Sequence, residues 1–307
     1  MDILITADTA GITVREMLRS RLRYSSNMIK KLKFSPGGIT VNGSFVTVRY
    51  VLAEGDTLSL ALEDSEADVS PYTVPAPLSL DVIYEDEWIT AVNKPPDMPS
   101  HPSHGHRLDT VSNALAYRYR DRNYVFRPVN RLDRDTSGCM LTANSRDAAY
   151  KMYLSMVSGR IRKTYLAVTD GVPDSLRGTL RSYLRRAEDS IVKRRVTSSD
   201  DPGGKEAVSG YEVIAASGCH SLVRLTPLTG RTHQLRLQLA SVGCPITGDD
   251  LYGTASDMIA RQALHSYITR FPHPQTDDEI TVTAPLPNDM RRLVSEWFGE
   301  DFADDFE

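Results

Sequence analysis

The chain has 307 residues, of which 25% are charged and 40% are hydrophobic. This composition excludes a disordered chain, and the length favours one large domain accompanied by a small one. The net charge of -4 would argue against a nucleic-acid partner only if the charge were spread evenly along the chain.

No apolar run approaches the roughly 18 residues of a membrane span, and the segment MDILITADTAG lacks the basic and apolar regions of a secretion signal. We therefore expect a cytoplasmic protein without a membrane partner. Cys139, Cys219 and Cys244 are scattered and lack the Cys/His spacing of a zinc site. We expect neither a disulfide framework nor a bound metal, and we interpret the three cysteines as buried small hydrophobes.

Positive charge is concentrated near the start of the chain. Between Gly11 and Tyr50 there are eight basic residues and one acidic residue, Glu16, so the local balance is 8 - 1 = +7 and the remainder carries -11. The basic residues are Arg15, Arg19, Arg21, Arg23, Lys30, Lys31, Lys33 and Arg49. Such a set on one face would contact phosphates with salt-dependent affinity, whereas the alternative is a solvated helical face.

The same region predicts two helices and then strands. Residues 13–22 have apolar side chains at helical spacing, and a second helix is expected to begin with Ser25 or Ser26 as its N-cap. The Asn42-Gly43 pair between two apolar runs predicts a tight hairpin, and a further strand is expected at residues 58–62.

This order of elements, with the sequences GGITVNG and VLAEGDTLSL, resembles the small RNA-binding domain named after ribosomal protein S-four. The resemblance covers residues 1–62. It implies that RNA is bound through basic side chains, which we assign to Arg15, Arg19, Arg21, Arg23, Lys30, Lys31 and Lys33.

A change of composition marks the end of this domain. Residues 63–79 are first acidic and then rich in proline, which is typical of a semi-rigid extended linker. We therefore expect a second, larger domain at residues 80–298. Residues 299–307 form an acidic tail that we expect to be solvated and disordered.

In the larger domain, short apolar runs separated by turn residues predict strands. They lie at residues 81–95, 160–171, 209–216, 219–228 and 278–286. Helices are fewer and are expected at residues 145–159 and 230–243. This pattern indicates an α+β class, with a mixed, mainly antiparallel sheet flanked by helices and loops and preceded by a small α/β domain. No G-x-G-x-x-G or Walker sequence is present, which disfavours a nucleotide cofactor.

The segment PVNRLDRDTSGCML, residues 128–141, places four charged residues between two apolar runs. If a strand extended this far, Arg131, Asp133 and Asp135 would share one face, and Asp133 would point into a cleft. A structural ion-pair network is the alternative interpretation, because buried charges require partners.

A second charged cluster begins at the Gly230 turn and includes Arg231, His233, Gln234 and Arg236. Arg231 would lie near the start of the helix expected at residues 230–243. Its planar guanidinium could hold a carboxylate from elsewhere in the fold, although a purely structural ion pair is again the alternative.

Beyond these clusters the chain resembles the RluA family of pseudouridine synthases over nearly its full length. Several motifs coincide in order: VNKPPDMPSHPS, RLDRDTSG, KTYLAV, GKEAVSGYEV, LTGRTHQLR and HS at His265. Asn130 departs from the pattern, because many members have histidine before the Arg-Leu-Asp triplet. This departure puts a role for residue 130 in doubt but not one for Asp133.

The resemblance implies an RNA-modifying isomerase that uses no metal or organic cofactor. It implies Asp133 as the essential carboxylate, Arg231 as its ion-pair partner and Tyr165 as the aromatic residue beside the target base. Arg131 would insert into RNA near the vacated position. We also assign substrate binding to Lys94, Thr136, His233 and Gln234. The expected partner is ribosomal RNA of the large subunit, with transfer RNA as the second choice, and the enzyme is expected to be a monomer.

The chemistry supports these roles but leaves two choices open. Pseudouridine formation breaks the bond from C1′ to N1, rotates the uracil and joins C1′ to C5, so an ionised carboxylate either adds to C1′ or assists proton removal at the sugar. Because a uridine in a helix is inaccessible, it must be extruded at a cost of a few kcal/mol. Tyr165 either stacks on the loosened base or relays the C5 proton through its hydroxyl.

Two other functions compete with this one. A non-catalytic RNA-binding factor would keep the fold without the chemistry, although Asp133, Arg231 and Tyr165 together disfavour it. A glycoside hydrolase would use Asp133 and Asp135 as its two carboxylates, but the chain has only two tryptophans to form sugar platforms.

Two further segments are ambiguous. Residues 184–199 are rich in arginine and lysine and either extend the phosphate-binding surface or form a solvated loop. His101, His104 and His106 cluster without a carboxylate or cysteine at metal-ligand spacing, so we assign them to a turn-rich loop by the active cleft rather than to a metal site.

Overall fold

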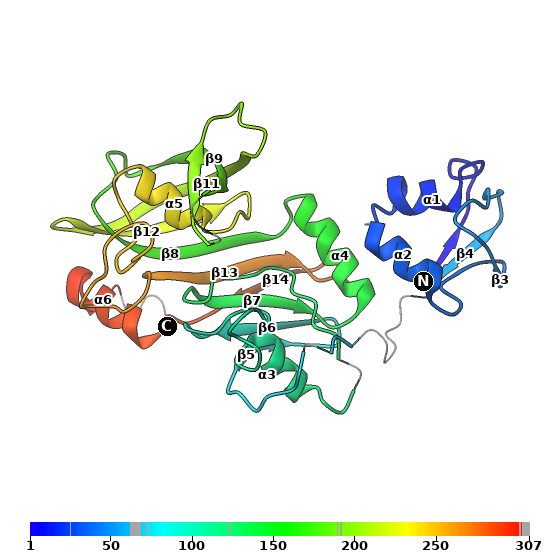
Figure 1. Cartoon of the computed structure of the whole chain (residues 1–307), viewed down its shortest axis with the longest axis horizontal. Helices are drawn as coiled ribbons and strands as arrows, with labels where there is room; N and C mark the ends of the chain where they lie inside the picture. Colours follow the sequence, from blue (N-terminus) through cyan, green and yellow to red (C-terminus); the bar gives the residue numbers. More distant parts are fainter. Residues whose placement is uncertain are drawn as a thin grey trace. The chain divides into compact units, whose positions relative to one another are not determined.

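The computed structural model divides the chain near residue 65 into two compact units, each described separately below (Figure 1). The residues that it describes are 1–24, 26–61, 69–71, 73–122, 124–188, 190, 192–300 and 302.

The N-terminal unit is a four-stranded antiparallel sheet with helical segments that pack apolar side chains into its core. The strand order is β1-β4-β2-β3, with bounds β1 (Asp2–Leu4), β2 (Ile39–Val41), β3 (Ser44–Phe45) and β4 (Thr57–Leu60). The helical segments are α1 (Val14–Glu16), the π-helix η1 (Met17–Arg21) and α2 (Ser26–Phe34). The core contains Val14, Leu18, Leu32 and Leu58, none of which is measurably exposed.

Local sequence explains these elements. Thr13 and Glu16 form a reciprocal capping box at the start of α1, in which each side chain accepts the other residue's backbone N–H. Asn42 and Gly43 both have positive φ, 50° and 78°, which confirms the predicted tight hairpin. Of the two N-caps proposed for the second helix, Ser25 lies outside the described residues.

The larger unit is built on one mixed sheet of ten described strands. The order is β10-β9-β11-β12-β8-β13-β7-β6-β5, and β14 also pairs with β13. The bounds are β5 (Asp81–Glu85), β6 (Ile89–Lys94), β7 (Ser137–Ala143), β8 (Arg162–Asp170), β9 (Arg177–Arg186), β10 (Arg194–Thr197), β11 (Lys205–Ser217), β12 (His220–Pro227), β13 (Leu264–Pro272) and β14 (Glu279–Thr283).

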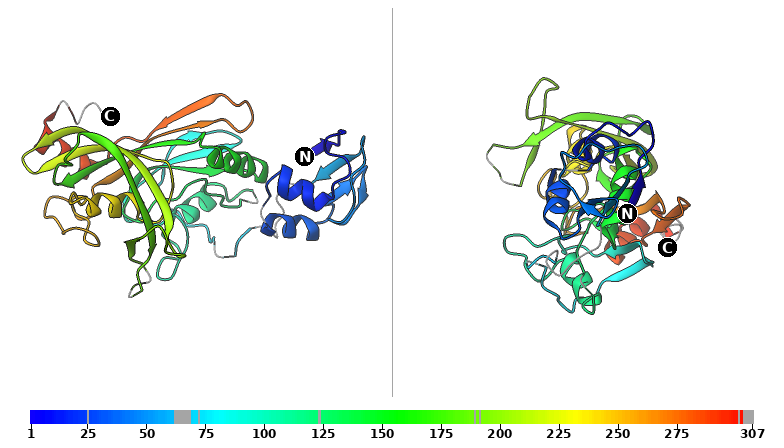
Figure 2. Two further views of the ribbon diagram at one scale, coloured as in Figure 1. Left: turned by 90° about the horizontal axis from the view of Figure 1, so that it is seen from above. Right: turned by 90° about the vertical axis from the view of Figure 1, so that its right-hand side faces the viewer.

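Nearly all neighbouring strands are antiparallel, and β13 with β7 is a parallel pair. This arrangement confirms the expected α+β class and mainly antiparallel sheet. The long strands β9 and β11 pair toward one end of the sheet (Figure 2). Part of the basic segment at residues 184–199 is therefore a strand pair, because Arg194 to Thr197 lie opposite Arg186 to Tyr183.

In the described part of this unit, four helices accompany the sheet: α3 (Val111–Arg118), α4 (Arg146–Val157), α5 (Gln234–Ser241) and α6 (Asn288–Phe298). The helix expected at residues 230–243 starts only at Gln234. Neither α3 nor α6 was predicted from the sequence. Six consecutive residues of α3 are buried, so this helix has no contrast between an apolar and a polar face.

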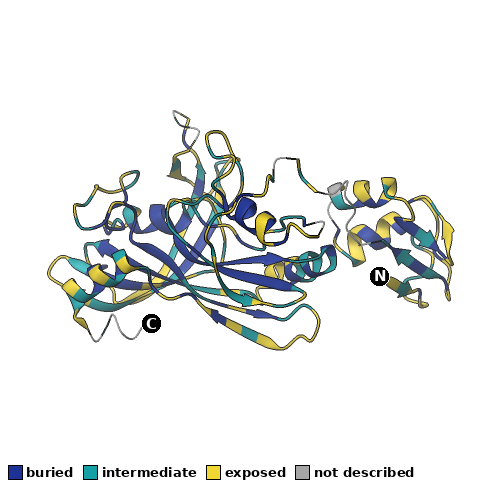
Figure 3. Cartoon of the chain, turned by 90° about the horizontal axis from the view of Figure 1, so that it is seen from below, coloured by how far each residue is buried: buried dark blue, intermediate teal, exposed yellow. Residues whose placement is uncertain are grey.

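Both faces of the central strands are covered, as the dark blue strands in Figure 3 show. Along β7, Met140 belongs to a core cluster that includes side chains of α3, α5 and α6, whereas Cys139 and Leu141 belong to a cluster that includes α4. This alternation explains why β7 is buried throughout. Cys244 is also buried, but Cys219 is exposed, contrary to expectation, because it follows Gly218 in the turn between β11 and β12.

The described part of the expected linker has no helix or strand, but hydrogen bonds join it to the larger unit. The side chain of Asn113 in α3 donates to the Val74 carbonyl at 2.6 Å, and the Ala76 N–H donates to the Asn113 carbonyl at 3.1 Å. Most of the acidic tail at residues 299–307 lies outside the described residues. Among the described helices, none has the length and apolar character that a bilayer crossing requires.

Candidate active site

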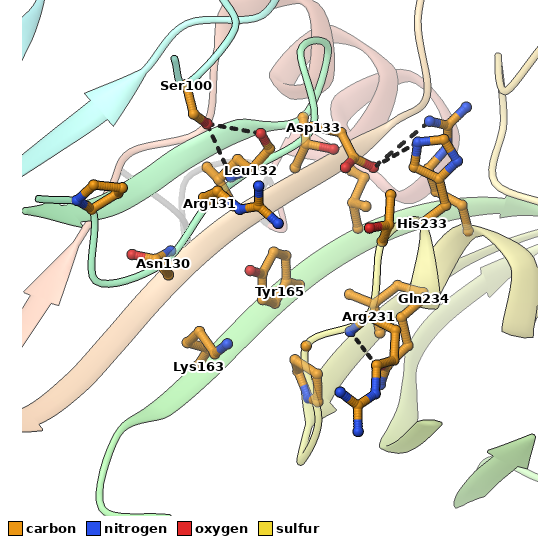
Figure 4. Close-up of a pocket in the computed structure, with 18 of the residues that line it drawn as sticks. Ser100, Asn130, Arg131, Leu132, Asp133, Lys163, Tyr165, Arg231, His233 and Gln234 are labelled. Carbon is orange, nitrogen blue, oxygen red and sulfur yellow. Dashed lines mark hydrogen bonds and ion pairs between the residues drawn. The ribbon is translucent and has the colours of Figure 1, made fainter. Parts of the chain in front are cut away.

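A cavity of about 680 Å³ opens in the larger unit, and segments that are distant in sequence line it (Figure 4). Three of these segments carry most of the predicted site residues. They are the loop before β7, which includes Arg131 and Asp133, the strand β8 with Lys163 and Tyr165, and the segment from Pro227 into α5. The two motif clusters singled out in the sequence thus meet around one cavity.

Asp133 lies in a loop rather than in a strand, since β7 begins only at Ser137. The expected alternation of Arg131, Asp133 and Asp135 on one strand face is therefore wrong. The loop closes through a turn in which the Thr136 N–H donates to the Asp133 carbonyl at 3.2 Å. The Ser100 hydroxyl donates to the Leu132 carbonyl at 2.9 Å and accepts its N–H at 3.3 Å, which fixes the residue before Asp133.

Lys94 contributes to this support and does not line the cavity. Its side chain is fully buried, and Nζ donates to the carbonyl oxygens of Pro95, Met98 and Arg134 at 2.7, 2.9 and 2.7 Å. Burial lowers the pKa of Lys94 to about 7. The expectation that Lys94 binds substrate is therefore wrong, because its three donors are already used to join the loop at residues 95–98 to the loop that carries Asp133.

Asp133 is flanked by two residues of the second cluster. Its Oδ2 is 3.7 Å from the Arg236 guanidinium and 4.0 Å from His233 Nε2. The carboxylate is partly exposed to the cavity, with 28% of its side-chain surface accessible. The ion pair expected between Asp133 and Arg231 is wrong, because Arg236 takes that place.

Asp249 fixes the orientation of Arg236. The guanidinium donates from Nε and Nη2 to the two Asp249 oxygens, both at 2.7 Å, and this carboxylate is fully buried. Burial alone would lower the pKa of Arg236, but Asp249 and, more weakly, Asp133 raise it. A charged, bidentately held guanidinium thus faces Asp133.

Arg231 lies in the turn before α5, and its side chain points away from Asp133 in the view of Figure 4. Its Nε donates to the Glu206 carbonyl at 2.9 Å, and its backbone N–H donates to Gln234 Oε1 at 2.9 Å. These bonds explain the failed expectation. Because the helix starts after His233, Arg231 is outside the helix and its direction is set by β11 instead.

Gln234 holds this turn together. Its Oε1 accepts from Thr229 Oγ1 and the Arg231 N–H, and its Nε2 donates to the Val208 carbonyl and Ser209 Oγ. Both donors and both acceptor positions of the amide are therefore occupied. The expectation that the Gln234 side chain binds substrate is wrong for this reason, although the residue borders the cavity.

His233 lies between the cavity and the aromatic ring of Tyr252. Its φ of 57° is in the left-handed region, and its Nδ1 is 2.9 Å from the Tyr252 hydroxyl. Burial lowers the pKa of His233, although the nearby Asp133 opposes this effect. At neutral pH we therefore expect a neutral imidazole beside the carboxylate.

Tyr165 and Lys163 lie two residues apart on β8 and both face the cavity. Tyr165 is only 7% exposed. Burial and the charge of Asp133 raise the pKa of its hydroxyl, against the opposing effect of Ser266, so the phenol is protonated at neutral pH. In Figure 4 the ring lies between Asp133 and Lys163.

The remaining residues assigned to substrate binding also border the cavity. Arg131 is exposed beside Asp133, whereas Thr136 is buried and its Oγ1 accepts from Gln262 Nε2 at 3.2 Å. Asp135, the second carboxylate of the glycosidase alternative, does not line the cavity and pairs with Arg134 at 3.1 Å. Among the described residues, Asp133 thus lacks the second cavity carboxylate that a glycosidase would need.

The seven basic residues of the N-terminal unit that we assigned to RNA binding are all exposed. Among their local contacts, Arg19 donates to Ser26 Oγ and Arg21 donates to the Asp8 carbonyl. In the larger unit, His101 borders the cavity and His106 pairs with Asp109. In the part of the chain that the structure describes, no group of three His, Cys, Asp or Glu side chains is placed to hold a metal.

The sequence reasoning placed Arg236 in the second charged cluster without giving it a role, and it missed Asp249. It included Arg194 only in the basic segment at residues 184–199. Arg194 borders the cavity, and its Nη1 is buried without a hydrogen-bond partner among the described residues. The role of Arg236 was open to prediction, because it lies in the same charged cluster as Arg231. Asp249 was not, since nothing local connects it with α5.

Comparison with known proteins identifies the class to which this fold and site belong. Residues 89–241 match the family model described as RNA pseudouridylate synthase. Among the solved structures, "Human RNA Pseudouridylate Synthase Domain Containing 1" is similar with a TM-score of 0.57 and 29% identity, covering 68% of this chain and 84% of that one.

Curated relatives extend the match over nearly the whole chain. An uncharacterized RNA pseudouridine synthase of Bacillus subtilis, YjbO, is 37% identical over 285 residues, which cover 92% of this chain and 98% of the relative. The ribosomal large subunit pseudouridine synthase D of Vibrio parahaemolyticus is 34% identical, with 83% of this chain and 81% of the relative covered. The chain belongs to the RluA-type family of RNA pseudouridine synthases and is an isomerase that converts uridine to pseudouridine in RNA.

Proposed function

We propose that the chain isomerises specific uridines of large-subunit ribosomal RNA, with Asp133 as the catalytic carboxylate. The observation that carries the assignment is the position of Asp133, at the cavity surface, 3.7 Å from a buried arginine and on the same cavity as Tyr165. The relatives named ribosomal large subunit pseudouridine synthase D support this RNA over transfer RNA.

The proposed roles follow from the contacts. Arg236, held by Asp249, pairs with the Asp133 carboxylate and fixes its direction. Tyr165 contacts the uracil after the bond from C1′ to N1 breaks and keeps the base in the cavity while it rotates. Asp133 then either leaves C1′ or returns a proton to the sugar as C1′ joins C5. The proton that C5 loses is balanced by one that N1 gains, so the product is an isomer of uridine.

The basic N-terminal unit supports delivery of RNA. We propose that it is a ribosomal-protein-S-four-type domain that contacts phosphates through the exposed side chains of Arg15, Arg19, Arg21, Arg23, Lys30, Lys31 and Lys33. Arg131, exposed beside Asp133, is suited to fill the space that the extruded uridine leaves.

The test compares pseudouridine maps of total RNA from a deletion strain and from strains that express the wild type, Asp133→Asn or Asp135→Asn. We expect one or more large-subunit sites to disappear on deletion, to return with the wild type and with Asp135→Asn, and to stay absent with Asp133→Asn. Asp135 is the matched control because it lies two residues away but outside the cavity. Activity of Asp133→Asn would refute its catalytic role, and lost sites in transfer RNA alone would refute the ribosomal target.

A further inference from the structure

Two cations in the cavity have no function in the chemistry described above. Lys163 lies partly buried on β8 and has neither a hydrogen-bond nor an ion-pair partner among the residues that the structure describes. Burial lowers its pKa. Because Lys163 lines the cavity, an anion that enters it would supply the acceptor that the described residues do not provide.

Arg231 lies next to it. The turn that carries Arg231 lies close to this ammonium group, because a Cβ placed on Gly230 would be 4.0 Å from Lys163 Nζ. Only Nε of Arg231 has an acceptor, the Glu206 carbonyl, and no carboxylate pairs with its terminal nitrogens in the described part of the chain. The free edge of a guanidinium fork suits two oxygens of one phosphate group.

The two cations lie on the other side of Tyr165 from Asp133, as Figure 4 shows. Lys163 and Tyr165 share one face of β8, about 6.8 Å apart along the strand. A nucleotide whose ribose faces Asp133 and whose base contacts Tyr165 carries phosphodiester groups on both sides of its sugar. One of these groups is the anion that would pair with Lys163 and Arg231.

We propose that Lys163 and Arg231 form a phosphodiester-binding site that positions the backbone of the extruded uridine in the cavity. The inference rests on the proposed function, because it assumes that Tyr165 contacts the base. It assigns a function to Arg231 that replaces the ion pair first expected for it. Both residues bind RNA and take no part in the steps at C1′.

The test uses two probes, the dinucleotide UpU and the nucleoside uridine, of which only UpU contains a phosphodiester group. The full chain with ¹³C-labelled lysine is titrated with each, and the Lys163 signal is assigned by its absence in Lys163→Arg. We expect UpU but not uridine to shift this signal. Lys163→Gln should weaken UpU binding roughly tenfold, the scale of one hydrogen bond to a charged group, and leave uridine binding unchanged.

Controls separate this site from general charge effects. Lys205→Gln removes an exposed lysine of the same unit outside the cavity and should leave UpU binding unchanged. Lys163→Arg keeps the positive charge and should retain most of the affinity. Equal shifts by UpU and uridine, no shift by either, or unchanged UpU affinity in Lys163→Gln with a lower kcat would overturn the proposal. Because binding is measured without turnover, UpU binding without isomerisation of any RNA would refute the proposed function and leave the phosphate site intact.

Discussion

Replacing Arg236 with methionine should both weaken the fold and stop turnover, because one guanidinium serves two carboxylates. Asp249, with no exposed side-chain surface, would lose both of its 2.7 Å bonds to Arg236. Removing one member of such a buried pair costs about 3–5 kcal/mol of unfolding free energy. Loss of the preorganised charge beside Asp133 should lower kcat roughly 10²- to 10³-fold.

The two effects can be separated with a second substitution. In the double variant Arg236→Met/Asp249→Asn the unpaired buried charge is gone, while the amide oxygen can still accept the N–H groups of Leu251 and Tyr252. We expect this variant to regain much of the lost stability in urea titrations and to remain inactive. The assay is pseudouridine formation on in-vitro transcribed RNA that carries a mapped target site.

Arg231→Met is the matched control, since Arg231 borders the same cavity without contacting Asp133. Its unfolding free energy should change by no more than about 0.5 kcal/mol, and its defect should lie in KM rather than in kcat. Wild-type kcat in the double variant, or an equal loss of kcat in Arg231→Met, would refute the assignment of Arg236 as the partner of Asp133.

Three further outcomes are expected. Lys94→Met leaves three partly buried carbonyls without their donor and should lower the unfolding free energy by at least about 3 kcal/mol, and a loss under about 1 kcal/mol in urea titration would contradict this. Lys30→Gln/Lys33→Gln should reduce the slope of log affinity against log salt by about 1.4–1.8, measured by RNA anisotropy, and an unchanged slope would exclude these exposed side chains from the interface. Burial lowers the pKa of His265 to about 4. The unfolding free energy is therefore unaffected by this histidine above pH 6.5, and it falls by about 2 kcal/mol at pH 5, where the imidazole is protonated in the unfolded chain but not in the fold. An NMR titration of His265 with a midpoint near its ordinary value of 6.5 would disprove this.

The sequence was most informative where a function depends on a local motif. The RLDRDTSG and KTYLAV motifs indicated Asp133 and Tyr165, and the structure brings both residues to one cavity. The hairpin at Asn42-Gly43 was equally open to prediction, because two residues with positive φ determine that turn by themselves.

The errors arose where a side chain's direction depends on distant backbone. Arg231 was expected to pair with Asp133, but the left-handed conformation of His233 delays the start of α5, and the Glu206 carbonyl then directs the Arg231 side chain. Lys94 was expected at the substrate, yet one of its acceptors is the carbonyl oxygen of Arg134, which lies 40 positions further along the chain. No spacing rule reveals such a contact before the sheet is assembled.

The bond between Arg236 and Asp249 has a consequence for how the site meets its substrate. Because Asp249 is buried and bidentate, the guanidinium is held in place whether or not RNA is present. The desolvation free energy of this guanidinium therefore opposes folding, and it does not oppose RNA binding a second time. RNA binding therefore does not need to reorient Arg236, and the positive charge beside Asp133 is already in place when the uridine enters the cavity.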